Sequence, residues 1–264
     1  ITHFDPRSGP AGSVVVISGN RFDPVPANNI VFFGAVRATV SEASVAELKV
    51  LVPTGATYAP LTVTGPDGYT AFSSQPFGQT FLSSGKVGLN SFARQRSPRV
   101  DNYPSSLLAA DLNGDGKVDL MSALRAPAEG NAFAVWENVT PSGSADAVFG
   151  EPVHFRASAP DGSGGGSFLA ALGDLNGDGK PDVVVVSTSR YGVFVFPNAS
   201  TGGRIAAESF PSHIDLGAET GLEASGLVVV DLDGDGRLDI VTCDRLKGAV
   251  VAFRNTHTGG WLAN

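Results

Sequence analysis

The sequence is poor in the residues on which several common classes of protein depend. Its 264 residues include one cysteine, and only 18 are lysine or arginine against 26 aspartate or glutamate. A single cysteine excludes an internal disulfide framework, and the apolar run around Cys243 predicts a small core residue there. A formal net charge of −8 argues against a nucleic-acid-binding surface, which needs clustered lysine and arginine.

Long hydrophobic segments and helical patterns are also missing. No apolar run is long enough to span a membrane, no signal peptide is recognisable, and the chain starts at Ile1. The 33 glycines and 17 prolines suit many short strands and turns rather than helices. We therefore expect an all-β chain without a membrane span, a processed piece of a larger exported protein.

Motifs of catalysis are lacking as well. The chain contains no GxSxG nucleophile elbow, no Walker loop and no histidine pair with metal-ligand spacing. We therefore expect no catalytic residues and no enzymatic activity. The four scattered histidines are expected at the surface or at the rim of the core: His3, His154, His213 and His257.

What the sequence does contain is an acidic nonapeptide that occurs three times. It reads DLNGDGKVD at 111–119, DLNGDGKPD at 174–182 and DLDGDGRLD at 231–239. Calcium takes six to eight oxygen ligands, which alternate residues of a short loop can supply, and a glycine at position 6 permits the sharp turn. We predict three Ca²⁺ sites, with side-chain oxygens from positions 1, 3, 5 and 9 and a backbone carbonyl from position 7: Asp111, Asn113, Asp115, Lys117 and Asp119; Asp174, Asn176, Asp178, Lys180 and Asp182; Asp231, Asp233, Asp235, Arg237 and Asp239.

Two other interpretations compete with this one. An EF-hand needs a glutamate at position 12 and flanking helices, but position 12 is Ser122, Val185 or Thr242 and the flanking runs are short and partly β-branched. Solvated turns also use Asp, Asn and Gly, and a single copy would leave that reading open. Three copies with oxygen-bearing residues at the same four positions favour metal binding.

The spacing of the loops indicates a repeat. Asp111, Asp174 and Asp231 open the loops 63 and then 57 residues apart. Each unit closes with an apolar and aromatic strand that ends near an asparagine, at 134–138, 193–198 and 250–255. A supersecondary unit of about sixty residues with four short strands is typical of a β-propeller blade.

The repeats resemble FG-GAP repeats, also called VCBS or integrin-α-like repeats, whose blades carry a DxDxDGxxD loop. All three loops match that motif, two of them with Asn at position 3, and Phe149, Gly150, Glu151 and Pro152 echo the family's name. The resemblance implies calcium used for rigidity in an extracellular or cell-surface protein, and it implies no reaction.

The first eighty residues have a different pattern. Val14, Val16 and Ser18 alternate with their neighbours, and similar alternation marks 38–40, 48–52 and 61–63. Strands of this length between turn signals predict an immunoglobulin-like β-sandwich. The segment resembles an IPT/TIG domain through a set of turn and core residues: Pro6, Ser8, Gly9, Pro10, Gly12, Gly19, Phe22, Phe33, Gly34, Val52 and Pro53.

We therefore predict an IPT/TIG domain over 1–82 and three four-stranded blades over 83–264. Three blades cannot close a propeller, which needs four to eight. Either the remaining blades lie outside this chain, or protein partners or self-association into a ring or filament complete the open blades. The predicted function is calcium-stabilised, non-catalytic adhesion or assembly. The alternative is a carbohydrate- or protein-binding accessory domain of a larger secreted protein or enzyme, with Trp136, Tyr191 and Trp261 as candidate sugar-stacking residues unless they are buried.

Overall fold

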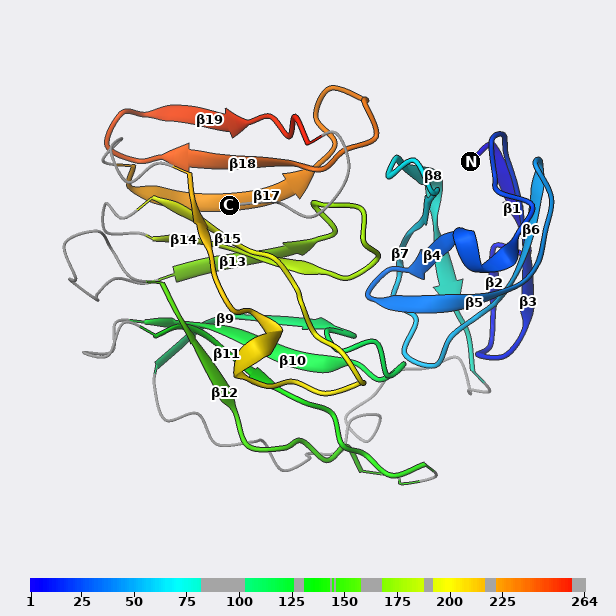
Figure 1. Ribbon diagram of the computed structural model, residues 1–264, viewed down its shortest axis with the longest axis horizontal. Coiled ribbons are helices and arrows are strands. Elements are labelled where there is room, and N and C mark those ends of the chain that lie inside the picture. The colour runs from blue at the N-terminus through cyan, green and yellow to red at the C-terminus, as the bar shows by residue number, and fades with distance from the viewer. Residues whose placement is uncertain are drawn as a thin grey trace.

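The chain folds as an N-terminal β-sandwich beside a stack of three small sheets. The computed structural model describes residues 1–81, 103–125, 131–142, 144, 146–157, 168–187, 192–216 and 222–257. Over these residues it is all-β, and the short 3-10 turns η1 (Pro26–Asn28) and η3 (Ala207–Ser209) interrupt the strands. Figure 1 shows the sandwich, in blue and cyan, against one side of the stack. Among the described residues, no helix has the length and apolarity to cross a membrane.

The sandwich confirms the strands expected in the first eighty residues. Its strands pair in the order β1-β3-β6-β5-β4-β7-β8-β2, and all of these pairs are antiparallel except β2 with β8. Alternate residues of the strands point inward, so Val15, Ile17, Leu48 and Val50 are fully buried. The bounds are β1 His3–Asp5, β2 Ser8–Gly9, β3 Val14–Ser18, β4 Ile30–Phe33, β5 Val36–Ala43, β6 Glu47–Leu51, β7 Ala59–Thr64 and β8 Thr70–Gln79.

Each of the three small sheets is antiparallel, with strands in chain order. The first holds β9 (Tyr103–Ala110), β10 (Asp119–Arg125), β11 (Asn131–Trp136) and β12 (Val153–Arg156). The second holds β13 (Phe168–Gly173), β14 (Asp182–Ser187), β15 (Val193–Phe196) and β16 (Ile214–Asp215). The third holds β17 (Ala224–Val230), β18 (Asp239–Asp244) and β19 (Ala249–Phe253). A fourth strand of the third sheet was expected beyond β19, where residues 258–264 lie outside the described residues.

The sheets stack face to face through two apolar layers. Met121 and Ala123 of β10 face the second sheet, and Val184 and Val186 of β14 face the third; all four are fully buried. The same two positions of β18 are Val241 and Cys243, which face away from the stack, and Cys243 is exposed. The prediction that Cys243 is a core residue is therefore wrong, because no described element covers that face.

The segment after β15 fastens the second sheet to the first. It runs down across the stack in Figure 1, in yellow, and includes η3. Ile205 and Phe210 enter the apolar layer between the two sheets, where the Phe210 ring lies edge-on to Phe133 at 5.5 Å. The backbone N–H of Ile205 donates to Oε2 of Glu137 at 3.0 Å.

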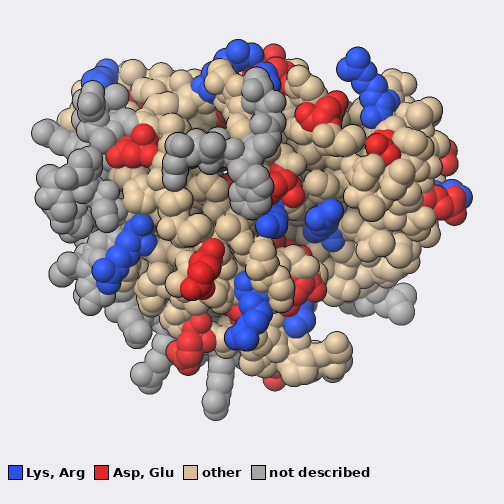
Figure 2. All heavy atoms as spheres, in the orientation of Figure 1, with Lys and Arg blue, Asp and Glu red and all other residues tan. Residues whose placement is uncertain are grey.

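The charged side chains do not gather by sign. On the face of the molecule in Figure 2, lysine and arginine are interspersed with aspartate and glutamate, and most of the surface is neither. No continuous basic patch is visible there over the described residues.

Candidate metal centres

Each acidic nonapeptide forms the turn between the first two strands of a sheet. Residues 111–119 join β9 to β10, 174–182 join β13 to β14, and 231–239 join β17 to β18. The glycine at position 6 has φ of +84°, +81° and +84° in the three loops, and the glycine at position 4 is also left-handed. The backbone reversal predicted from the glycines is confirmed, and strands rather than EF-hand helices flank the loops.

The first aspartate of each loop organises the turn by accepting hydrogen bonds from the loop's own backbone. Oδ1 of Asp111 accepts from the N–H groups of Gly114 at 2.8 Å and Asp115 at 3.1 Å, while Oδ2 accepts from Gly116 at 2.9 Å. The same three bonds recur in the other two loops. Oxygens at positions 3 and 5 each accept from the N–H two residues later in every loop. The residues at positions 1, 3 and 5 therefore organise the same turn in all three loops.

The last aspartate of each loop is buried and closes the turn. Asp119 and Asp182 are fully buried and Asp239 is 2% exposed. In the first loop, Oδ2 of Asp119 accepts from the N–H of Leu112 at 3.0 Å and Oδ1 accepts from the N–H of Asn138 at 2.8 Å. Burial raises the pKa of Asp119 and of Asp182 to about 7, and that of Asp174 to about 6. The loops thus place carboxylates where the ionised form is unfavourable unless a positive charge lies beside it.

An asparagine that the sequence pattern did not assign to the site supports each loop. Asn138, Asn198 and Asn255 follow the third strand of their sheets, and each side-chain amide donates to the carbonyl at position 8 of its loop. Asn138 and Asn198 also open glycosylation sequons, but their amides are engaged in these bonds and Asn198 is fully buried. The signal for their role was the asparagine that closes each repeat.

The donor set fits a hard divalent cation. Carboxylate oxygens of Asp231, Asp233 and Asp239 lie within 4.8 Å of one another. In the second loop, Oδ2 of Asp178 is buried and accepts no hydrogen bond, which is an acceptor left for a cation. Oxygen ligands without nitrogen or sulfur favour calcium or magnesium over transition metals. The position-7 residues would contribute only their carbonyls, since the side chains of Lys117 and Arg237 pair with the aspartate at position 5.

All three loops touch the sandwich, a relationship that the sequence did not reveal. The N–H of Asp111 donates to the carbonyl of Ala35 at 3.1 Å, and the N–H of Thr70 donates to the carbonyl of Gly236 at 2.9 Å. In the second loop, a Cβ added to Gly179 would lie 2.7 Å from Cδ1 of Ile30. The sandwich is therefore docked directly on the three turns.

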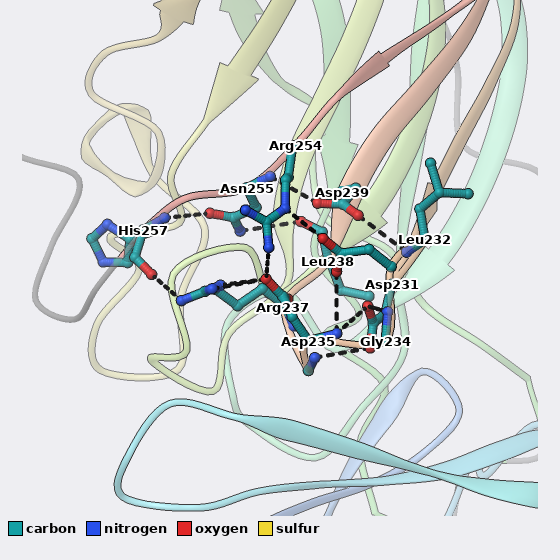
Figure 3. A network of polar contacts seen from close by, with 12 residues as sticks. Asp231, Leu232, Gly234, Asp235, Arg237, Leu238, Asp239, Arg254, Asn255 and His257 are labelled. Carbon is teal, nitrogen blue, oxygen red and sulfur yellow. Dashed lines mark hydrogen bonds and ion pairs between the residues drawn. The ribbon is translucent and has the colours of Figure 1, made fainter.

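The third loop has an additional network of arginines. Figure 3 shows Arg237 and Arg254 converging on Asp235 while Asp231 and Asp239 hold the turn. Arg237 also lies over the ring of Tyr69 in the sandwich, with its guanidinium carbon 5.8 Å from the ring centroid. The arginine at position 7 thus serves both the loop and the contact with the sandwich.

Residues proposed for other roles have different surroundings. Trp136 is 2% exposed in the core of the first sheet, so it offers no sugar-stacking face, whereas Tyr191 and Trp261 lie outside the described residues. His3 is exposed, as expected of a surface residue. His213 is half-buried against Phe194 and Phe196, and burial lowers its pKa. The described histidines form no cluster with metal-ligating residues.

Comparisons with known proteins agree with this description of the two parts. The family model for the IPT/TIG domain matches residues 1–78, and the model for the FG-GAP-like repeat matches residues 174–242. No curated protein matches the chain. Domains of these two types are those of binding or accessory modules, are generally non-catalytic and are common in extracellular proteins.

Several solved structures are distantly similar. A protein of unknown function from Bacteroides thetaiotaomicron is 13% identical with a TM-score of 0.34, and the alignment covers 98% of this chain and 60% of that one. An auxiliary nutrient binding protein from the same species is 11% identical, with a TM-score of 0.29 and coverage of 98% and 87%. An Agrocybe aegerita lectin that recognises non-reducing terminal N-acetylglucosamine is 23% identical, with a TM-score of 0.36 and coverage of 75% and 49%. The chain thus spans about three-fifths of the length of the first of these structures. The family models show that the chain carries an IPT/TIG domain followed by an FG-GAP-like repeat.

Proposed function

We propose that the chain is a calcium-stabilised, extracellular binding and assembly module without catalytic activity. Each of the three loops would hold one Ca²⁺ through the oxygens of positions 1, 3, 5 and 9 and the carbonyl of position 7. The observation that carries the proposal is the same hydrogen-bonded turn, formed three times and in contact each time with the sandwich. Three bound ions would change the formal net charge from −8 to about −2.

Calcium would act here as a structural crosslink. Each loop joins two strands of its sheet, accepts the backbone N–H of the asparagine after the third strand, and contacts the sandwich. A cation at this point offsets the cost of burying ionised carboxylates such as Asp119 and Asp182. Sites of this type fill at the millimolar calcium concentrations found outside cells.

The surface proposed for a protein partner is the outward face of the third sheet. Six side chains of one face of β17, β18 and β19 are all apolar or cysteine: Val228, Val230, Val241, Cys243, Val250 and Ala252. Val228 is 54% exposed and Val250 is 71% exposed, whereas the corresponding faces of the first and second sheets are covered by the next sheet. A protein that presents a similar apolar sheet face, a second copy included, would bury this surface in adhesion or assembly.

The test is a calcium titration of the whole chain, in which the unfolding temperature is measured at each calcium concentration. Light scattering of the same samples measures the mass of the species in solution. We expect calcium to raise the unfolding temperature and excess chelator to lower it. A triple variant, Asp111→Asn with Asp174→Asn and Asp231→Asn, should lose the response, and Asp146→Asn, which changes an exposed aspartate outside the loops, should keep it.

Two results would count against the proposal. An unfolding temperature that does not respond to calcium would contradict the proposal that the loops hold Ca²⁺. A monomer that binds no protein partner with calcium, together with binding on a glycan panel, would favour the carbohydrate-binding accessory domain instead.

A further inference from the structure

The third loop differs from the other two in one acidic residue and in one basic residue. Position 3 is Asp233, where the first two loops have Asn113 and Asn176. The residue just before the asparagine that closes each repeat is Glu137, Pro197 and Arg254 in turn. The third repeat therefore has both an additional carboxylate, at Asp233, and an arginine just after its third strand, at Arg254.

The structure brings these two residues together. Nε of Arg254 forms an ion pair with Oδ2 of Asp233. Nη2 of Arg254 lies 2.9 Å from Oδ2 of Asp235, a contact drawn in Figure 3. The hairpin of β18 and β19 places Arg254, one residue past Phe253, beside the turn, because Phe253 pairs with Ile240 at the start of β18. One guanidinium thus spans the carboxylates of positions 3 and 5, both predicted cation ligands.

Arg237 engages the same site from within the loop. Its Nη2 lies 2.8 Å from Oδ2 of Asp235, and its Nη1 donates to the carbonyl of His257 at 3.1 Å. The basic residue at this position is Lys117 in the first loop, with Nζ 3.5 Å from Oδ2 of Asp115. A position-7 cation is therefore common to the repeats, and the arginine from outside the loop distinguishes the third.

We propose that Arg254 is a counter-ion of the third loop and lowers the calcium affinity of that loop below that of the first two loops. This proposal rests on the calcium sites proposed above. Calcium entering this loop must replace the guanidinium at Asp233 and Asp235 or share those oxygens with it, and the two cations repel each other. The side chain of Arg254 is 57% exposed, so it can move into solvent when the ion arrives.

The proposal also explains the additional carboxylate. A fourth aspartate alone would strengthen calcium binding and would leave the empty loop with one more unpaired charge. Arg254 neutralises that charge when calcium is scarce, and the contact between Gly236 and Thr70 then persists without the ion. The third loop becomes the site that empties first and still keeps its turn.

The experiment is isothermal titration of the full chain with calcium chloride after chelator treatment. We expect two tight sites and one about tenfold weaker in the unchanged chain, and Arg254→Gln should tighten the weak site about tenfold without changing the others. Arg254→Lys, which keeps the charge but loses the two-oxygen geometry, should fall between them. Asp231→Asn should remove only the weak site, which assigns it to the third loop.

The matched control is Arg245→Gln, which changes an exposed arginine in the turn between β18 and β19 that pairs with Glu223 away from the loop. It should leave all three affinities unchanged. Three equal sites in the unchanged chain, or no tightening in Arg254→Gln, would overturn the role of Arg254 and leave the calcium proposal standing. An absence of calcium binding in every variant would overturn both.

Discussion

The side-chain amide of Asn198 donates a hydrogen bond of 2.8 Å to the carbonyl of Leu112, which lies 86 residues earlier in the first loop. The same amide donates to the carbonyl of Pro181 in its own loop at 2.9 Å. Asn255 repeats this arrangement one sheet later, with the carbonyls of Leu175 and Leu238. The loops are therefore linked in series along the stack, each to the next sheet.

We predict that Asn198→Ala destabilises the chain by about 2–4 kcal/mol, because it leaves the carbonyl of Pro181 without its donor and the N–H of Ser200 without its acceptor. The carbonyl of Leu112 keeps the hydroxyl of Ser200 as a donor but loses the link to the second loop. Chemical denaturation monitored by circular dichroism would measure the loss. The control is Asn28→Ala, which changes an exposed asparagine of η1 and should stay within about 0.5 kcal/mol of the unchanged chain. Equal effects of the two substitutions would contradict a linking role for Asn198.

A comparison of two glycine variants distinguishes the cost of backbone strain in a loop from the cost of disturbing its contact with the sandwich. Gly116 and Gly179 occupy the same loop position at φ of +84° and +81°, but an added Cβ meets nothing within 4 Å at Gly116 and meets Ile30 at 2.7 Å at Gly179. Both alanine variants should lose about 1–2 kcal/mol to the left-handed backbone.

Gly179→Ala should lose about 1 kcal/mol more, since its methyl group forces Ile30 and the sandwich away from the second loop. Thermal unfolding of the two variants in saturating calcium measures the difference. If Gly116→Ala costs as much as Gly179→Ala, the second loop does not depend on close contact with the sandwich.

The sequence predicted what depends on residues close together in the chain. The glycine positions specified the turns, and the alternation of Leu48 and Val50 specified a strand with one buried face. At 14–18 the strand is confirmed, but its buried residues are Val15 and Ile17 rather than the predicted alternate set that begins at Val14, because all four residues from 14 to 17 are apolar. These features follow from local backbone sterics and from side-chain periodicity. The asparagine that ends each repeat was visible in the sequence, but its bond to the preceding loop depends on how the sheets stack.

The features that the sequence did not predict depend on tertiary arrangement. The bond from Thr70 to Gly236 joins a backbone N–H to a backbone carbonyl, and neither group has a side-chain signature. The pairing of Arg254 with Asp233 requires the register of the β18–β19 hairpin. Cys243 has an apolar setting in the sequence, but the pattern does not say whether another sheet covers it.

Stability should depend on pH in opposite directions with and without calcium. Burial raises the pKa of Asp119 and Asp182 to about 7 from an ordinary value of 3.8, so between these values the folded chain holds protons that the unfolded chain has released. Stability of the chelated protein should therefore fall as pH rises through this window.

Calcium stabilises the ionised carboxylates, so the loaded protein should instead gain stability over the same range. Unfolding temperatures at pH 5 and pH 8, with excess chelator and with millimolar calcium, give the four values needed. The same pH trend in both conditions would show that these carboxylates do not hold the ion.

The exposed thiol of Cys243 offers a direct test of the outward face of the third sheet. The equivalent residues of the first and second sheets, Ala123 and Val186, are fully buried against the next sheet, whereas Cys243 is exposed beside Val250. A thiol reagent should therefore modify one cysteine per chain in dilute folded protein with calcium, at a rate close to that in denaturant. When a high protein concentration or a partner drives association on this face, the thiol should be modified more slowly. In Val250→Asp the rate of modification should no longer depend on protein concentration or partner, and stability should change by less than about 0.5 kcal/mol. A thiol that is protected in the dilute chain would mean that this face is already covered, and the proposed docking surface would have to be abandoned.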